Sequence, residues 1–298
     1  MNRRAVLPLL LIQTLLVLGP PEMASAQQAS LTLEDYGKWE SPGNPVLTPD
    51  GKWMAYTISR NNETDELRLR ELRTDADWVF LFGAGPAFSR DNRWLAFRIE
   101  PSPEEAAGLR KEGEPLRNDL AILDLAGVPV ASGTPSGATP LDTTRSEGSQ
   151  GFAFSGDGRF LAVQRYQAEG SEAGVGQDLL VRDLPSGTQT HLGNVTEFAW
   201  SDQGHLLALV ISASGQVGNG VQLFDPATGT LRVLDSKPKD YQGLTWREDA
   251  ADLAVLRSEP DTMHGDTAFS VLAWKDLGNR ASLSFLLDAS DRADLPEG

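Results

Sequence analysis

The sequence predicts an all-β protein built from about five repeated four-stranded sheets, and two observations carry this prediction. A ten-residue pattern returns five times without internal gaps, and most copies are followed by an apolar segment that ends in an acidic residue. The five copies are LTPDGKWMAY (47–56), FSRDNRWLAF (88–97), FSGDGRFLAV (154–163), WSDQGHLLAL (200–209) and WREDAADLAV (246–255). A pattern that recurs in register along most of a chain indicates a repeat architecture.

Each copy is predicted to form the end of one strand, a tight turn and a second strand. Pro49, Asp50 and Gly51 suit such a turn, because proline presets one backbone angle and the other two tolerate tight geometry. The second strand is apolar on both faces, which is typical of a strand buried between two sheets. An alanine recurs in the ninth position, which indicates a close approach of neighbouring backbone. The alanines in this position are Ala55, Ala96, Ala162, Ala208 and Ala254.

Two further strands are expected to complete each unit. The third strands are predicted at 67–72, 120–125, 179–184, 221–226 and 271–277, and fourth strands at 186–192 and 228–234. Four strands in a repeat of roughly this length are typical of a β-propeller blade, whereas the rungs of a linear β-solenoid, the alternative, are shorter. We therefore predict one β-propeller domain over residues 27–298, with repeats near 44–85, 86–150, 151–196, 197–242 and 243–298.

The interval between the second and third copies is longer than the others and is expected to hold an insertion. The segment PSPEEAAGLRKEGEP (101–115) predicts one short helix near 103–112, with Glu104 and Glu105 in its first turn. The Gly/Ser/Thr/Pro-rich stretch 131–150 predicts a flexible outer loop.

Composition excludes several classes of function. The chain has 42 acidic and 26 basic residues, a formal net charge of −16, so nucleic acid and anionic membrane surfaces are not expected as partners. It has no cysteine, which excludes a disulfide framework, a thiolate zinc site and a cysteine nucleophile.

The first 26 residues are interpreted as a secretory signal peptide. Arg3 and Arg4 precede an apolar run from Ala5 to Leu18, which is shorter than the ~20 residues that span a bilayer. Ala24-Ser25-Ala26 forms a small-x-small cleavage site. We therefore expect a secreted or periplasmic bacterial protein that does not stay in the membrane after cleavage, with an uncleaved anchor as the alternative.

No residue in the sequence is assigned a catalytic, cofactor-binding or metal-binding role, and no cofactor is expected. The histidines show none of the spacings of a metal motif, and His205 shares a repeat column with Lys52, Arg93 and Arg159, which favours a solvated turn residue. The G-x-S-x-G elbow of serine hydrolases is absent. The acidic groups Glu34 with Asp35, and Asp288 with Asp291 and Asp294, lack the spacing of a calcium loop. The remaining histidines are His191 and His264.

The repeat resembles the Asp-containing, WD40-like propeller repeats of TolB and of the N-terminal domain of prolyl oligopeptidase-type serine peptidases. The segments that narrow the resemblance are LTLEDYGKWESPGNPVLTPDGKWMAYTI (31–58), PAFSRDNRWLAFRIEPSPEEA (86–106) and NDLAILDLAG (118–127). They are similar to the start of secreted bacterial members of that peptidase family. The resemblance covers about residues 31–285.

That resemblance implies a function without supplying a catalytic residue. In the family, a propeller of seven or eight blades precedes an α/β-hydrolase domain that carries the Ser, Asp and His, and the propeller filters access of peptides. The hydrolase motifs have no counterpart here, so the chain is expected to be an incomplete ring, a fragment, and inactive alone. We expect it to gate or position peptide substrates for a hydrolase domain. The alternative is a free-standing TolB-like periplasmic propeller that binds protein partners.

The first prediction concerns export. The protein should be cleaved after Ala26, because a charged start, a short apolar run and Ala-Ser-Ala together form a signal peptidase substrate. N-terminal sequencing of the exported protein should begin at Gln27. An exported protein that still begins with Met1 would contradict the cleavage.

Overall fold

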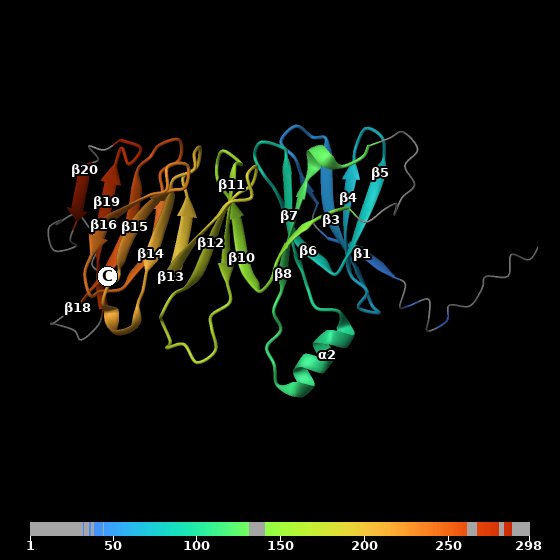
Figure 1. The fold of residues 1–298 in the computed structure, drawn as a ribbon, viewed down its shortest axis with the longest axis horizontal. Coiled ribbons are helices and arrows are strands. Elements are labelled where there is room, and N and C mark those ends of the chain that lie inside the picture. The colour runs from blue at the N-terminus through green and yellow to red at the C-terminus, as the bar shows by residue number, and fades with distance from the viewer. Residues whose placement is uncertain are drawn as a thin grey trace, which may run out of the picture.

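The structure is a computed structural model that describes residues 32, 36, 39–43, 45–130, 141–260, 267–279 and 283–287. It contains four antiparallel sheets that stand side by side in a row (Figure 1). The signal peptide predicted for residues 1–26 lies outside the described residues.

The first two sheets each form one unit, which we call blades 1 and 2. Blade 1 has five strands because its first strand is interrupted near Gly43, so that β1 and β2 both pair with β3. Blade 2 has four strands in chain order. The strands of blade 1 are β1 (Glu40–Pro42), β2 (Val46–Leu47), β3 (Trp53–Arg60), β4 (Glu66–Glu71) and β5 (Ala76–Leu81). Those of blade 2 are β6 (Gly83–Phe88), β7 (Trp94–Ile99), β8 (Asp119–Asp124) and β9 (Thr144–Ser146).

The third sheet has seven strands and comprises two blades, because the long strand β13 serves both. Residues 189–192 of β13 pair with β12, and residues 195–200 pair with β14. Blade 3 holds β10 (Ser149–Phe154), β11 (Phe160–Arg165), β12 (Gln177–Asp183) and the first part of β13 (Gln189–Trp200). Blade 4 holds the rest of β13 with β14 (Leu207–Ile211), β15 (Gly220–Asp225) and β16 (Thr230–Ser236).

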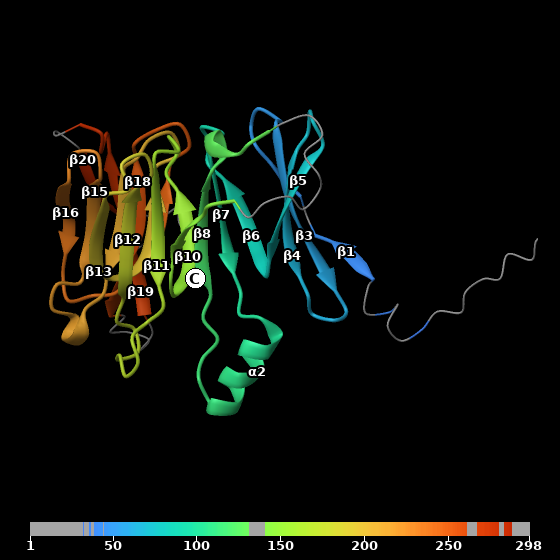
Figure 2. The same cartoon turned by 45° about the vertical axis from the view of Figure 1, so that its right-hand side comes forward.

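The fourth sheet is blade 5, and with it the prediction of about five blades is confirmed. Its strands are β17 (Tyr241–Trp246), β18 (Leu253–Pro260), β19 (Thr267–Lys275) and β20 (Leu283–Leu287). Blades 1 and 5 lie at opposite ends of the row in Figure 1, and on opposite sides of the molecule in Figure 2, so the described part of the chain is an open propeller rather than a closed ring.

The predicted helical insertion is confirmed as α2 (Pro103–Glu112), which leaves blade 2 between β7 and β8. Ser102 and Glu105 form a capping box at its start, and Gly113 ends it with a φ of 77°. Two 3-10 turns, η1 (Leu125–Gly127) and η2 (Ser214–Gln216), lie in other connections. The expectation of a loop throughout 131–150 is wrong in its second half, where β9 and β10 pair with β8 and β11. Residues 131–140 lie outside the described part.

A hydroxyl side chain closes the tight turn between the first and second strands. Thr48 Oγ1 donates to Asp50 Oδ1 at 2.6 Å and accepts from the Trp53 amide at 3.0 Å. Ser155 repeats both bonds in blade 3, at 2.6 Å to Asp157 and 2.9 Å from the Phe160 amide. The turn therefore satisfies its own buried polar groups before the strand enters the core.

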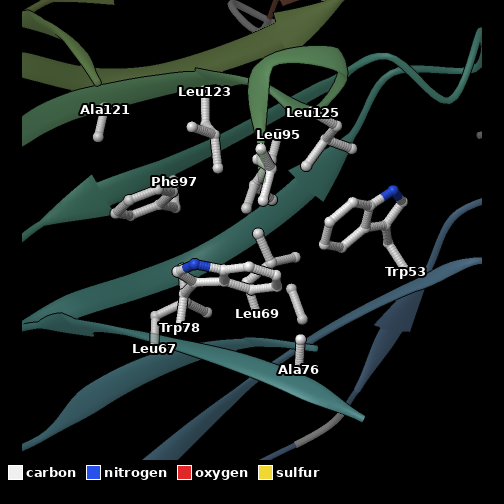
Figure 3. Packing of buried hydrophobic residues seen from close by; sticks show 12 residues of the cluster. Trp53, Leu67, Leu69, Ala76, Trp78, Leu95, Phe97, Ala121, Leu123 and Leu125 are labelled. Carbon is white, nitrogen blue, oxygen red and sulfur yellow. The ribbon is translucent and has the colours of Figure 1, made fainter. Parts of the chain in front are cut away.

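The apolar core consists of four clusters, one between each pair of neighbouring blades. Successive side chains of a strand point to opposite faces, so each inner blade contributes to the clusters on both of its sides. Leu161 packs towards blade 2, for example, whereas its neighbours Phe160 and Ala162 pack towards blade 4. In Figure 3, Trp78 of blade 1 lies close to Phe97 of blade 2, and Trp53 of blade 1 lies close to Leu125. The ring centroids of Trp53 and Trp78 are 5.7 Å apart.

The recurring alanines make room for side chains rather than for backbone. Ala55, Ala96, Ala162 and Ala208 are fully buried. Each shares a cluster with the large residue that opens the repeat in the following blade. The pairs are Ala55 with Phe88, Ala96 with Phe154, Ala162 with Trp200 and Ala208 with Trp246. A small residue on one sheet thus accepts an aromatic residue from the next.

This packing predicts the cost of enlarging the column. Ala162→Leu should lower the free energy of unfolding by about 1–3 kcal/mol, because extra carbon atoms must displace side chains in a filled cluster. Urea unfolding followed by far-UV circular dichroism measures this. Ala227→Leu, at an exposed turn, is the matched control and should leave the midpoint unchanged. Equal midpoints for both variants would show that residue 162 is not packed.

Candidate functional site

The strands of each blade have two ends, and the connections at these two ends differ. At one end, which we call the turn end, lie the hydroxyl-closed turns between first and second strands. At the other, the loop end, lie the longer connections between second and third strands. These are residues 61–65, 100–118, 166–176 and 212–219. Helix α2 and these loops project from the same end in both views (Figures 1 and 2). Loops on a rigid scaffold are common positions for binding residues.

Ion pairs lie along the turn end. In the sequence, their two partners appear only as separate columns, one in the repeat and one at the end of the third strand. In blades 2 and 3, the arginine of the repeat meets the acidic residue that ends the third strand of the same blade. Arg93 Nη2 lies 2.9 Å from Asp124 Oδ2, and Arg159 Nη2 lies 2.7 Å from Asp183 Oδ2. Both guanidinium groups also lie 4.9 Å from the ring centroid of the aromatic residue that follows them. These charged side chains are therefore paired with one another within their own blades.

His205 takes the cation position in blade 4 and connects two blades. Its Nδ1 lies 2.8 Å from Asp157 Oδ2 of blade 3, and its Nε2 lies 3.4 Å from Asp225 Oδ1 of its own blade. Burial opposes ionisation of Asp157, but bonds from the Ser155 hydroxyl, the Arg159 amide and His205 together hold the pKa of that carboxyl below its ordinary value. His205 is therefore a bridge between blades and more than a solvated turn residue.

The loop end holds a hollow of about 450 Å³ between blades 3, 4 and 5, which we call the acidic hollow. Its charged lining residues are the carboxylates Glu172 and Asp240. Glu172 Oε2 accepts from Ser214 Oγ at 2.6 Å, and Asp240 Oδ1 accepts from Gln216 Nε2 at 3.3 Å. Each carboxylate keeps further acceptor capacity, since an ionised carboxylate offers about four acceptor positions.

The walls of the acidic hollow are fixed by hydrogen bonds between loops. Asn219, which is 1% exposed, accepts from the Ala213 amide at 2.8 Å and donates to the Lys239 carbonyl at 3.0 Å. Ser212 Oγ donates to the Gly174 carbonyl at 2.7 Å. Gly176 has no space for a side chain, because a Cβ there would lie 2.1 Å from the Asn194 backbone. These contacts hold the three loops in one arrangement.

Tyr241 joins the acidic hollow to a buried ion cluster. Its hydroxyl donates to Asp235 Oδ2 at 2.7 Å, and Arg257 Nη1 lies 3.2 Å from the same oxygen. Burial and the Asp235 carboxylate raise the pKa of Tyr241 well above its ordinary value, so the phenol stays protonated as a donor. Arg257, 5% exposed, also binds Glu259 at 2.8 Å. This cluster fixes the phenol ring of Tyr241, which forms one wall of the acidic hollow.

A second hollow of about 500 Å³ lies beside α2. Its lining includes the carboxylates of Glu100, Glu105, Glu112 and Asp119 and the guanidinium groups of Arg117 and Arg145. Arg117 lies 3.5 Å from Glu169 in the loop of blade 3, and its guanidinium lies 5.9 Å from the Tyr166 ring centroid. The loop end thus carries two hollows with an excess of carboxylates.

The residues considered from the sequence alone do not converge on one place. His191 is exposed on β13, whereas His205 lies at the turn end. The Ser155 hydroxyl is occupied by its turn. Asp35, Glu34, His264 and the group at 288–294 lie outside the described residues.

Among the described residues, no three His, Asp or Glu side chains are grouped so as to hold a metal ion. None of the helices described is long and apolar enough to cross a membrane.

Comparisons with known proteins show similarity at the level of structure only. No family model matches the chain, and no curated protein matches it. The β-propeller domain of the Trilobed protease from Pyrococcus furiosus superposes with a TM-score of 0.44 and 11% identity over 86% of this chain and 74% of that one. A prolyl endopeptidase gives 0.46 and 16% over 84% of this chain. TolB from Acinetobacter baumannii gives 0.35 and 17% over 79% of this chain.

The chain spans 37% of the prolyl endopeptidase and 52% of TolB. At such identities and TM-scores, the assignment of the fold depends on the strands and blades of the chain itself.

The sequence did not point to the residues of the acidic hollow. Glu172, Ser214 and Asp240 lie in connections that do not repeat, so no column of the repeat marks them. The turn hydroxyls carried a signal that could have been used, because the second position of four repeats is Thr or Ser. These residues are Thr48, Ser89, Ser155 and Ser201.

The lowered pKa of Asp157 predicts how stability depends on pH. A carboxyl with a depressed pKa in the folded state contributes stability above its unfolded pKa of about 3.9, and that contribution is lost as the pH falls through the folded pKa. Asp157→Asn should therefore lower the unfolding free energy at pH 7 by on the order of 1 kcal/mol.

The difference from the native protein should shrink as the pH falls below about 4, where the carboxyl of the unfolded chain becomes protonated, and should vanish below the lower pKa of the folded carboxyl. Urea unfolding between pH 7 and pH 3 measures it. Asp178→Asn, at an exposed position, serves as the control and should show little effect. A difference that stays constant across this range would mean that the charge of Asp157 is not responsible.

Proposed function

We propose that the chain is the non-catalytic propeller portion of a secreted prolyl oligopeptidase-type serine peptidase, which gates or positions peptide substrates for a hydrolase domain. The observation that carries the proposal is the loop end, where two hollows with excess carboxylates sit on a rigid stack of blades. The resemblance of the repeat to that family agrees with it. The proposal includes export: the chain would lie outside the cytoplasm after cleavage of the predicted signal peptide.

The chemistry of the acidic hollow favours one class of peptide. Among the described residues that line it, Glu172 and Asp240 are the charged ones, and none is a lysine or an arginine. A peptide with a lysine, an arginine or a free amino terminus would supply the missing positive charge. Fixed carboxylates attract such a ligand more strongly than a neutral or acidic peptide of the same length. We therefore propose cationic peptide segments as the preferred ligands.

A binding role without chemistry also agrees with the described side chains. Acyl transfer needs an activated nucleophile, a base within hydrogen-bond reach and donors for the oxyanion. The carboxylates of Asp157 and Asp225 flank His205, and the Ser155 hydroxyl is bonded within its turn. The chemistry would then belong to a separate hydrolase domain.

Binding is tested with fluorescent peptides of equal length, one rich in lysine and one rich in glutamate, by fluorescence anisotropy. The lysine peptide should bind more tightly, and added salt should weaken it. The variant with both Glu172→Gln and Asp240→Asn should bind it about tenfold more weakly, equivalent to about 1.4 kcal/mol. Asp178→Asn is the control. Equal binding of both peptides, or no effect of the double variant, would contradict a site in the acidic hollow.

Two further measurements separate the peptidase portion from its alternative, a free-standing periplasmic propeller that binds proteins. A fluorophosphonate probe should not label the protein, and stoichiometric labelling of a serine would contradict the non-catalytic role. Sequencing of the DNA beyond codon 298 should reveal an in-frame G-x-S-x-G. A stop codon there would favour the free-standing propeller.

A further inference from the structure

Each blade receives the next blade on one row of residues that crosses its strands. In blade 3 the row is Ala153, Ala162, Val181 and Thr190, and in blade 4 it is Ala199, Ala208, Leu223 and Arg232. Both rows begin with two alanines. They leave space for a large side chain that arrives from the following blade.

The arriving side chain is the first residue of the repeat. Trp200 of blade 4 packs into the cluster of Ala162, and its indole Nε1 donates to the Ala153 carbonyl at 3.0 Å. Trp246 of blade 5 does the same with Ala208 and donates to the Ala199 carbonyl at 2.9 Å. Two successive interfaces therefore use one mode of contact: an aromatic plug fills a row of small residues, which we call the socket.

Blade 5 has the same socket without a described occupant. The equivalent row is Thr245, Ala254, Ala273 and Phe285. These residues line an outward-facing hollow of about 410 Å³. Ala254 and Ala273 are half-buried, whereas their counterparts in blade 4, Ala208 and Leu223, are 0% and 2% exposed. The surface that lines this hollow is almost entirely apolar, so its removal from water by an apolar side chain is favourable.

Blade 1 has the complementary feature, a plug without a socket. Leu47 is the first residue of its repeat and pairs with Met54 as Trp246 pairs with Leu253. The equivalent residues Phe88, Phe154, Trp200 and Trp246 are all partly buried against the preceding blade. Leu47 is 55% exposed, because no described blade precedes it.

We propose that the outer face of blade 5 binds the outer face of blade 1 of a second copy of this chain, with Leu47 entering the socket of Thr245, Ala254, Ala273 and Phe285. The contact continues the interface that the blades already use within one chain. It joins two different surfaces head to tail, so copies can add at both ends until a ring closes or a chain grows. It is independent of peptide binding at the loop end, and it concerns the chain of residues 27–298: in a longer protein these same two faces would receive that chain's own further blades.

The charges of blade 1 do not oppose this contact. On its outer face, Glu66 binds Arg60 at 2.9 Å and Arg68 at 2.6 Å, and Glu40 binds Arg60 at 2.7 Å. The guanidinium groups of blade 1 are therefore compensated before the second copy arrives. On blade 5, Arg247 and Asp252, which also line the hollow, lie 3.2 Å apart, and Lys275 Nζ lies 5.6 Å from the Phe285 ring centroid. The contact is mainly apolar and should persist at high salt, unlike the binding of a cationic peptide.

The test uses two variants that each disable one end. Leu47→Asp removes the plug, and Ala254→Arg blocks the socket. The native protein should show an average mass above one chain that rises with concentration in analytical ultracentrifugation, and each variant alone should be monomeric. An equimolar mixture should form one-to-one dimers, because each variant keeps one intact end. Leu231→Asp and Ala227→Arg, at exposed positions of blade 4, should self-associate like the native protein.

Phe285→Lys provides a second socket variant at an exposed side chain, in case Ala254→Arg unfolds. Since the chain contains no cysteine, single cysteines also report the contact directly. A mixture of Leu47→Cys and Ala254→Cys proteins should give more disulfide-linked dimer under mild oxidation than either protein alone or than Leu231→Cys with Ala254→Cys. A native protein that is monomeric at all concentrations, or a cross-link that forms best between two Leu47→Cys copies, would overturn the proposal.

Discussion

The packing of a large side chain from one sheet against an alanine of the sheet before it is the contact on which the rest of the structure depends. It requires every inner strand to be apolar on both faces and every blade to have a neighbour. Burial of an indole or phenyl ring between sheets supplies much of the apolar area that offsets chain entropy. The indole hydrogen bonds of Trp200 and Trp246 to backbone carbonyls also fix the register of one blade on the next. The turns, ion pairs and loops are then held at defined positions along this row.

The blades could be predicted from the sequence because their contacts repeat. Asp50 stands in a column that is Asp in four of the five repeats, and Ala55 in one that is Ala in all five, so one alignment reveals the turn and the buried strand together. The meaning of the alanine column was harder to obtain, since a small residue fits close backbone and a large side chain equally well. Only the arrangement of neighbouring blades distinguishes Ala208 against Trp246 from an approach of main chain.

The acidic hollow could not be predicted in this way. Glu172, Ser214 and Asp240 come from the connections of three blades and lie far apart in the sequence, and each connection has its own length. Their proximity results from the stacking of blades 3, 4 and 5 and from the buried amide of Asn219. The helix α2 was predictable because its signals are local: Ser102, Pro103 and Glu105 together form a helix start. Sites assembled from distant loops have no such local signal.

Strand β13 gives blades 3 and 4 a relation that the other blades lack. Its first part completes one sheet and its second part begins the next, without a chain break or a loop between them. Separation of these two blades would therefore break β13, one continuous strand that is hydrogen-bonded to both sheets and bends at Asn194. We therefore expect blades 3 and 4 to unfold as a single cooperative unit, in which amide protons on either side exchange together. The two walls of the acidic hollow that blades 3 and 4 contribute are anchored on this unit, so they should separate from each other only when the unit itself unfolds.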